Sequence, residues 1–192
     1  MGKKDFGLFQ ISNVSDLCYT VAVTKLYILC GIPFSGKSTL AREMVKILGV
    51  ERIDLDEVKF ELFGKDTIDE NLKKEDWDKV YQKMHKQIED LLRAKKSAVH
   101  DTGNFTKYER GLVRKIADKV GGIEIVTIFV DTPYKIAKER LINNRDEKRR
   151  FNVTDEDFEG AVAEMERPGA DENTLVYDSK IPKDRWINKN LQ

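Results

Sequence analysis

Eight consecutive residues, 31–38 (GIPFSGKS), match the pattern G-x-x-x-x-G-K-[ST] at every fixed position. In such a loop, glycines let the backbone curl so that successive N–H groups point at phosphate oxygens, and the N-terminus of the following helix adds partial positive charge. The Lys37 ammonium would bridge the β- and γ-phosphates of a nucleotide, and the Ser38 hydroxyl would ligate Mg²⁺. The spacing therefore predicts a loop that binds ATP and Mg²⁺.

The alternative, an ordinary turn between a strand and a helix, is weaker because an apolar strand precedes the loop and helical periodicity follows it. Thr39, the first residue after the motif, is placed to reach the α-phosphate. We expect the nucleotide contacts to come from the loop and the first helical turn, namely Gly31, Pro33, Ser35, Gly36, Lys37, Ser38 and Thr39.

Three carboxylates follow the next two predicted strands. Asp54 and Asp56 come at the end of one strand, and Asp101 ends the next. The carboxyl ends of parallel strands face one crevice, so these acids would lie near the loop. Either Asp54 or Asp56 could accept the proton of an acceptor hydroxyl, although helix N-capping or a solvated pair also explains them. Asp101 could hold a magnesium-bound water or orient the acceptor, or it could simply form a turn.

A stretch rich in arginine follows later in the chain. Arg140, Arg145, Arg149 and Arg150 could belong to a lid, over about residues 140–158, that closes on the phosphates and neutralises charge on the transferred group. The plainer interpretation of such a run is a solvated surface. We expect at least one of these arginines to contact phosphate, and the sequence leaves open which one.

Strands alternate with helices along the chain, which predicts a mostly parallel sheet covered on both faces. We therefore expect an α/β fold with three layers, α/β/α, and about five strands, followed by a polar tail. The expected strands are 26–30, 51–54, 98–101, 123–130 and 175–177, and the expected helices are 39–48, 73–96, 107–120, one beginning at Pro133, and 154–165.

Composition narrows the class of protein. The 192 residues carry 34 Lys and Arg against 34 Asp and Glu. A net charge of zero argues against a protein that binds a long stretch of nucleic acid or an anionic membrane surface. It is compatible with binding to a short nucleic-acid end. Cys18 and Cys30 are too few for a disulfide framework, which favours a cytoplasmic protein. We expect an extension of unknown role over residues 1–24 and one domain over 25–192.

Three further segments accompany the loop in a specific order. They are 53–59 (IDLDEVK), 100–106 (HDTGNFT) followed by Glu109 and Arg110, and 129–134 (FVDTPY) leading into Arg140. Together they resemble the P-loop kinases of the adenylate-kinase-like class, in the group of polynucleotide 5′-kinase, chloramphenicol phosphotransferase and the zeta-toxin kinases. The resemblance covers roughly residues 25–177.

The resemblance implies roles for individual residues. Asp56 would be the general base, Asp101 would support the acceptor or the metal, and Arg145 in the lid would stabilise the transferred phosphoryl group. Pro168, together with Glu172, is similar to a pair that lies near the adenine. The chain departs from polynucleotide kinase at Lys59, where an arginine grips a substrate phosphate, because lysine cannot make the same bidentate contact.

These observations favour an ATP- and Mg²⁺-dependent kinase that transfers the γ-phosphoryl group to a hydroxyl of a small molecule or a nucleic-acid end. The alternative is a nucleotide-binding regulatory or RNA-associated factor that hydrolyses ATP slowly and has no dedicated acceptor. Such a factor would keep the loop and tolerate loss of Asp54 and Asp56. The sequence identifies neither the acceptor nor the oligomeric state.

Overall fold

The computed structural model describes residues 23–65, 67–147 and 153–192. Five strands form one sheet in the order β2-β3-β1-β4-β5, and every neighbouring pair is parallel. The expected extension over residues 1–24 therefore lies almost wholly outside the described residues. The strands are β1 (Lys25–Cys30), β2 (Glu51–Asp54), β3 (Ala98–Asp101), β4 (Glu124–Val130) and β5 (Thr174–Tyr177).

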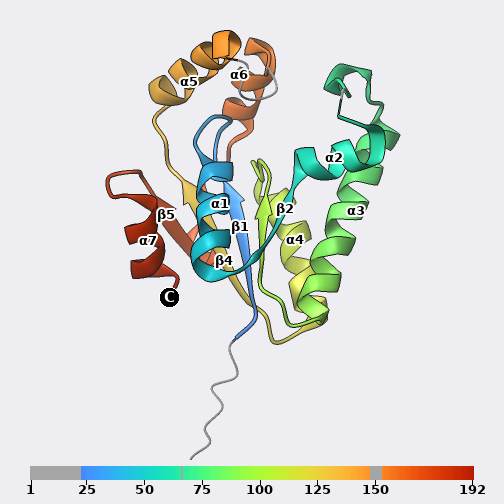
Figure 1. The fold of residues 1–192 in the computed structure, drawn as a ribbon, viewed down its shortest axis with the longest axis vertical. Coiled ribbons are helices and arrows are strands. Elements are labelled where there is room, and N and C mark those ends of the chain that lie inside the picture. Colours follow the sequence, from blue (N-terminus) through green and yellow to red (C-terminus); the bar gives the residue numbers. More distant parts are fainter. Residues whose placement is uncertain (1–22, 66, 148–152) are drawn as a thin grey trace, which may run out of the picture.

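Helices cover both faces of this sheet, which confirms the predicted three layers (Figure 1). One face packs against α1 and α7, and the other packs against α3 and α4. The helices are α1 (Lys37–Leu48), α2 (Leu55–Phe63), α3 (Lys74–Arg93), α4 (Lys107–Val120), α5 (Tyr134–Glu147), α6 (Asp155–Glu164) and α7 (Lys183–Asn190), with single 3₁₀ turns η1 (Asp69–Asn71) and η2 (Ala170–Glu172).

The central strand β1 is buried on both faces, as its continuous apolar run predicts. Its side chains alternate between two hydrophobic cores. Leu26 and Ile28 belong to the core under α3 and α4, whereas Tyr27 and Leu29 belong to the core under α1 and α7. Both layers therefore hold β1 in place, and with it the start of the phosphate-binding loop.

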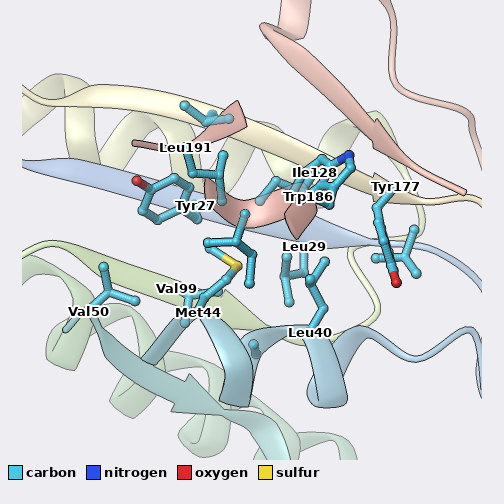
Figure 2. Packing of buried hydrophobic residues seen from close by; sticks show 14 residues of the cluster. Tyr27, Leu29, Leu40, Met44, Val50, Val99, Ile128, Tyr177, Trp186 and Leu191 are labelled. Atoms are coloured by element: carbon cyan, nitrogen blue, oxygen red, sulfur yellow. The ribbon is translucent and has the colours of Figure 1, made fainter. Parts of the chain in front are cut away.

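Helix α1 carries the loop at its N-terminus and lies flat on the sheet. Its inner stripe includes Leu40 and Met44, which have no exposed surface. Figure 2 shows these two side chains packed among Leu29 and Val99 of the strands. The helix ends as predicted at Gly49, whose φ of 65° is left-handed and whose N–H donates to the carbonyl of Val45.

The expectation of a purely polar tail is wrong. Helix α7 buries Trp186 and Ile187 against the sheet, and Leu191 just beyond it is buried too (Figure 2). The Trp186 ring lies 5.4 Å from the Tyr177 ring, and its Nε1 donates to the carbonyl of Val176 at 3.1 Å. A few apolar residues among many charged ones gave too weak a periodicity to predict this helix.

Two arms extend beyond the carboxyl ends of the strands, on opposite sides of the loop (Figure 1). One contains α5 and α6 and includes part of the predicted lid. The other contains α2, η1 and the first turns of α3. No helix in the described ranges is long and apolar enough to cross a membrane.

Candidate active site

The loop between β1 and α1 has the curled backbone that its glycines predict. Gly31 has a φ of 144°, and a Cβ at this position would lie 2.8 Å from the carbonyl oxygen of Val130. Gly36 has a φ of 104° and precedes α1. Side chains at either residue would strain the loop, so these two glycines are required by its shape.

Phe34 anchors the loop to the lid arm. Its φ of 60° is unusual for a residue with a Cβ. The Phe34 side chain packs with Ala137 and Leu141 of α5 and with Phe158 of α6. This small hydrophobic core holds the loop backbone in its strained shape and joins the loop to the arginine-bearing helix.

The interior of the loop offers donors suited to phosphate. Lys37 Nζ lies across the loop and donates to the carbonyls of Gly31 at 2.6 Å and Ile32 at 2.9 Å. Ser35 Oγ is buried and has no hydrogen-bond partner in the described part of the chain. The Ser35 carbonyl accepts from Thr132 Oγ1 at 2.7 Å. An ammonium, an unpaired hydroxyl and a helix N-terminus therefore meet where a nucleotide phosphate would bind.

The predicted magnesium residues meet directly. Ser38 Oγ donates to Asp101 Oδ1 at 3.2 Å, and the Asp101 side chain is almost fully buried. Hydroxyl and carboxylate oxygens are the hard donors that Mg²⁺ prefers, so this pair fits the ion. The described residues contain no cluster of three or more His, Cys, Asp or Glu that could enclose a metal. Mg²⁺ usually keeps several waters and binds through one or two protein oxygens together with substrate phosphates.

Arg52 on β2 also belongs to this site, and the sequence analysis missed it. Its Nε donates to Asp101 Oδ2 at 2.7 Å, its NH1 donates to Glu57 Oε1 at 2.6 Å, and its NH2 contacts Asp54 Oδ2. The strand alternation carries the available signal, because Arg52 and Asp54 are two residues apart and so share one face. Arg52 holds the carboxylates of β2, β3 and α2 together.

Asp54 and Asp56 have different environments. Asp54 is the N-cap of α2, accepts from the Glu57 N–H at 3.0 Å, and is mostly buried. Burial raises the pKa of Asp54 to about 6, against the opposing effect of Arg52. The Asp56 side chain is 45% exposed and pairs with Lys59 at 3.0 Å. Asp54 therefore has a structural role in capping and pairing, and Asp56 is the more accessible carboxylate.

The lid arginines have separate partners. Arg140 NH1 donates to the carbonyls of Phe34 at 3.0 Å and Ser35 at 3.1 Å, so it lies on the phosphate-binding loop. Arg145 NH2 pairs with Asp155 at 2.7 Å and joins α5 to α6. Arg149 and Arg150 lie outside the described residues. Of the two arginines that can be placed, only Arg140 contacts the loop itself.

A cavity of about 370 Å³ opens beside the loop, between α5 and the segment that joins β5 to α7. Polar side chains from all three elements surround it, which suits the sugar and base of a nucleotide. The sequence gives no signal for the last segment, because the apolar periodicity of α7 is too weak to predict a helix there. The lining residues are Phe34, Ser35, Gly36, Thr39, Arg140, Asn143, Asn144, Tyr177, Ser179 and Lys183.

The segment containing Pro168 and Glu172 lies elsewhere. Glu172 is buried and accepts from Arg110 Nε at 2.7 Å and NH2 at 3.0 Å. The neighbouring Glu166 N–H donates to the Phe105 carbonyl at 2.9 Å. These contacts fix the segment to the start of α4, and Pro168 is not among the residues that line the cavity. A contact between Pro168 and adenine stays a prediction.

Comparison with known proteins agrees with this geometry. Residues 26–168 match the AAA domain family AAA_33. A curated relative, shikimate kinase of Clostridium botulinum (strain Loch Maree / Type A3), is 30% identical over 122 residues, which are 64% of this chain and 68% of the relative.

Solved structures share the fold at low sequence identity. The APS kinase CysC of Mycobacterium tuberculosis, in complex with AMPPNP and APS, is 19% identical with a TM-score of 0.62, over 88% of this chain and 95% of that one. A chain of the Pnkp1/Rnl/Hen1 RNA repair complex is 20% identical with a TM-score of 0.64, over 79% of this chain and 47% of that one. With its five-stranded parallel sheet and phosphate-binding loop, this chain belongs to the AAA domain family AAA_33, in the P-loop kinase group.

Proposed function

We propose that this protein is an ATP- and Mg²⁺-dependent kinase that transfers the γ-phosphoryl group to a hydroxyl of a small molecule or a nucleic-acid end. One observation carries the proposal. Adjacent strands β2, β3 and β1 end in Asp54, Asp101 and the phosphate-binding loop, so the carboxylates and the loop lie together at one edge of the sheet. Matches to kinases in the P-loop group support it.

The site residues divide the work of transfer. Lys37 would hold the β- and γ-phosphates, while Ser38 and Asp101 would hold Mg²⁺, which would supply positive charge next to the phosphate oxygens. The acceptor oxygen forms a bond to the γ-phosphorus, the bond from that phosphorus to the bridging oxygen breaks, and ADP leaves. Asp56 accepts the hydroxyl proton.

The lid would contribute the remaining positive charge. Arg140, already on the loop, would contact the nucleotide, and the cavity that it lines with Thr39 and Ser179 would take the ribose and base. Arg145 would stabilise the transferred phosphoryl group once it exchanges Asp155 for phosphate. Both arginines are on α5, which Phe34 ties to the loop.

Transfer of labelled γ-phosphate tests the proposal. Purified protein is incubated with γ-labelled ATP, Mg²⁺ and a panel of hydroxylated small molecules and 5′-hydroxyl oligonucleotides, and labelled products are separated from inorganic phosphate. A labelled acceptor is expected. Strong ATP hydrolysis with no labelled acceptor in the whole panel would instead favour an ATPase without a dedicated acceptor.

A further inference from the structure

Around Asp56, exposed carboxylates pair with cations that are much more deeply buried. The side chains of Asp56, Glu57 and Asp69 are 45%, 67% and 53% exposed. The side chains of the cations that pair with them are much less exposed, 12% for Arg52 and 0% for Lys59. A molecule that approaches Asp56 from solvent therefore meets carboxylates first, with the neutralising cations behind them.

Arg52 has all three of its guanidinium nitrogens engaged. Nε and NH2 each lie 2.7 Å from Asp101 Oδ2, NH1 lies 2.6 Å from Glu57, and NH2 also contacts Asp54. A guanidinium shared among three carboxylates cannot take up a further anion without giving up one of these partners. Releasing Asp54 or Asp101 would leave a largely buried carboxylate unpaired, which is costly, and the third partner, Glu57, is itself an exposed carboxylate on the approach to Asp56.

Lys59 is fixed even more firmly. Its Nζ lies 3.0 Å from Asp56 and 2.6 Å from Asp69, and the rings of Phe60 and Trp77 pack 4.9 Å and 5.7 Å from the ammonium. These contacts join α2, η1 and α3. Lys59 therefore stabilises the packing of this arm from inside, and because its side chain is buried it is not available to bind a substrate anion.

The ion pairs around Asp56 contain more carboxylates than cations. Among the described residues of β2, β3, α2 and η1, the five carboxylates in contact with Arg52 and Lys59 outnumber those two cations. Arg110 on α4, the other fully buried cation among the described residues, is occupied by Glu172 and by the carbonyls of Asn104 and Phe105. An anionic acceptor next to Asp56 would be repelled by the exposed carboxylates.

We propose that the acceptor is a neutral or cationic hydroxylated small molecule, such as a sugar, polyol or amino sugar, and that it carries no phosphate or carboxylate near the reacting hydroxyl. This inference rests on the kinase activity proposed above and narrows its acceptor. The transfer itself is unchanged: the acceptor oxygen bonds to the γ-phosphorus, ADP leaves, and the proton goes to Asp56. A nucleic-acid end, with phosphates beside its hydroxyl, is disfavoured.

Acceptors matched in shape and different in charge test this directly. We would measure kcat/KM for glucosamine, glucose and glucuronate, for adenosine and its 3′-monophosphate, and for a 5′-hydroxyl oligonucleotide. We expect each neutral or cationic compound to exceed its anionic counterpart by about tenfold or more. Raising the salt concentration should lower kcat/KM for glucosamine and leave that for glucose nearly unchanged.

Two Glu→Gln variants on neighbouring segments locate the effect. Glu57→Gln removes one exposed carboxylate beside Asp56. It is expected to lower the ratio of kcat/KM for a neutral acceptor to kcat/KM for its anionic counterpart by about threefold. Glu51→Gln, at the other end of β2, removes a carboxylate that pairs with Lys96 at 3.1 Å and should leave the ratio unchanged. A ratio between two acceptors is independent of the fraction of folded enzyme.

The outcomes separate the two proposals. Equal or better use of glucuronate, adenosine 3′-monophosphate or the oligonucleotide would overturn the inference about charge and leave the kinase proposal standing. An equal change of the ratio in Glu57→Gln and Glu51→Gln would also overturn it. ATP binding without transfer to any of these compounds would overturn both proposals.

Discussion

Ser38 Oγ donates a hydrogen bond to Asp101 Oδ1 at 3.2 Å, although the two residues are 63 positions apart in the chain. The contact exists because β1 and β3 are parallel neighbours, with Ile28 opposite His100. The loop that follows β1 and the carboxylate that ends β3 therefore reach the same edge of the sheet. The proposed Mg²⁺ site rests on this pair.

The first prediction concerns this pair. Ser38→Ala and Asp101→Asn should each raise the Mg²⁺ concentration needed for half-maximal transfer, by about 10- to 100-fold, because each removes an oxygen ligand or its support. Mg²⁺ titration of transfer and Mn²⁺ binding in the presence of ATP measure this effect. Glu43→Gln, on the same helix α1, is the control. Unaltered metal dependence in both variants would remove the pair from the metal site.

The second prediction compares two glycines. Gly31→Ala places a Cβ 2.8 Å from the Val130 carbonyl at a φ of 144°, so it should destabilise the fold and weaken ATP binding. Gly111→Ala, within α4, has open space around the new methyl and should stabilise the fold by about 0.5–1 kcal/mol. Chemical denaturation and nucleotide titration measure both. Tight ATP binding by Gly31→Ala would contradict the required loop shape.

The third prediction concerns the buried pair of Arg110 and Glu172. The hydrogen bond from Arg110 lowers the pKa of the Glu172 carboxyl below its usual value. Arg110→Met should lower the free energy of unfolding by about 3–5 kcal/mol, because Glu172 is left charged and unpaired in the interior. Met at both positions should recover part of this loss. Lys107→Met, which removes an exposed pair with Asp171, should change little. Equal effects of Arg110→Met and Lys107→Met would contradict this interpretation.

The fourth prediction concerns pH. Burial, and then the nearby His85, lower the pKa of His100 from 6.5 to about 3. The folded state therefore favours neutral His100, which contributes stability that is present above pH 6.5 and is lost as the pH falls toward 3. Wild type should lose stability over this range, and His100→Gln should lose less.

Thermal or urea unfolding from pH 7.5 down to pH 4 measures this difference between wild type and His100→Gln. At pH 7.5, where His100 is neutral, the difference in the free energy of unfolding between the two proteins gives the cost of altered packing and of the changed contact with Asn104. Parallel pH curves for the two proteins would show that His100 contributes no pH dependence.

The sequence was sufficient to predict most of the fold because the main elements have strong local signals. The β1 run of apolar residues, the glycines after α1 and α4, and the Thr154 cap of α6 each predict a boundary that the structure confirms within two residues. Helix α3 is shorter than expected. It ends at Arg93, before Lys95 takes a left-handed φ of 59°.

Other parts depend on contacts that no local pattern encodes. Helix α7 is held by a few apolar residues that dock under β5, so its composition alone indicated a polar tail. The roles of Arg52 and Lys59 arise from carboxylates on β2, β3, α2 and η1 that only the fold brings together. The residue pattern left open whether Asp54 or Asp56 is the base, and only the resemblance favoured Asp56. In the structure, burial and helix capping distinguish the two residues.

The most direct test of the proposed transfer is Asp56→Asn. The substitution keeps the size of the side chain and removes its ability to accept a proton, and the buried Lys59 ammonium keeps its pair with Asp69 at 2.6 Å, which supports the fold. We expect ATP affinity close to that of wild type and loss of at least about 100-fold in kcat for transfer to the best acceptor. Transfer at the wild-type rate by Asp56→Asn would contradict the proposed role of Asp56 and the mechanism built on it.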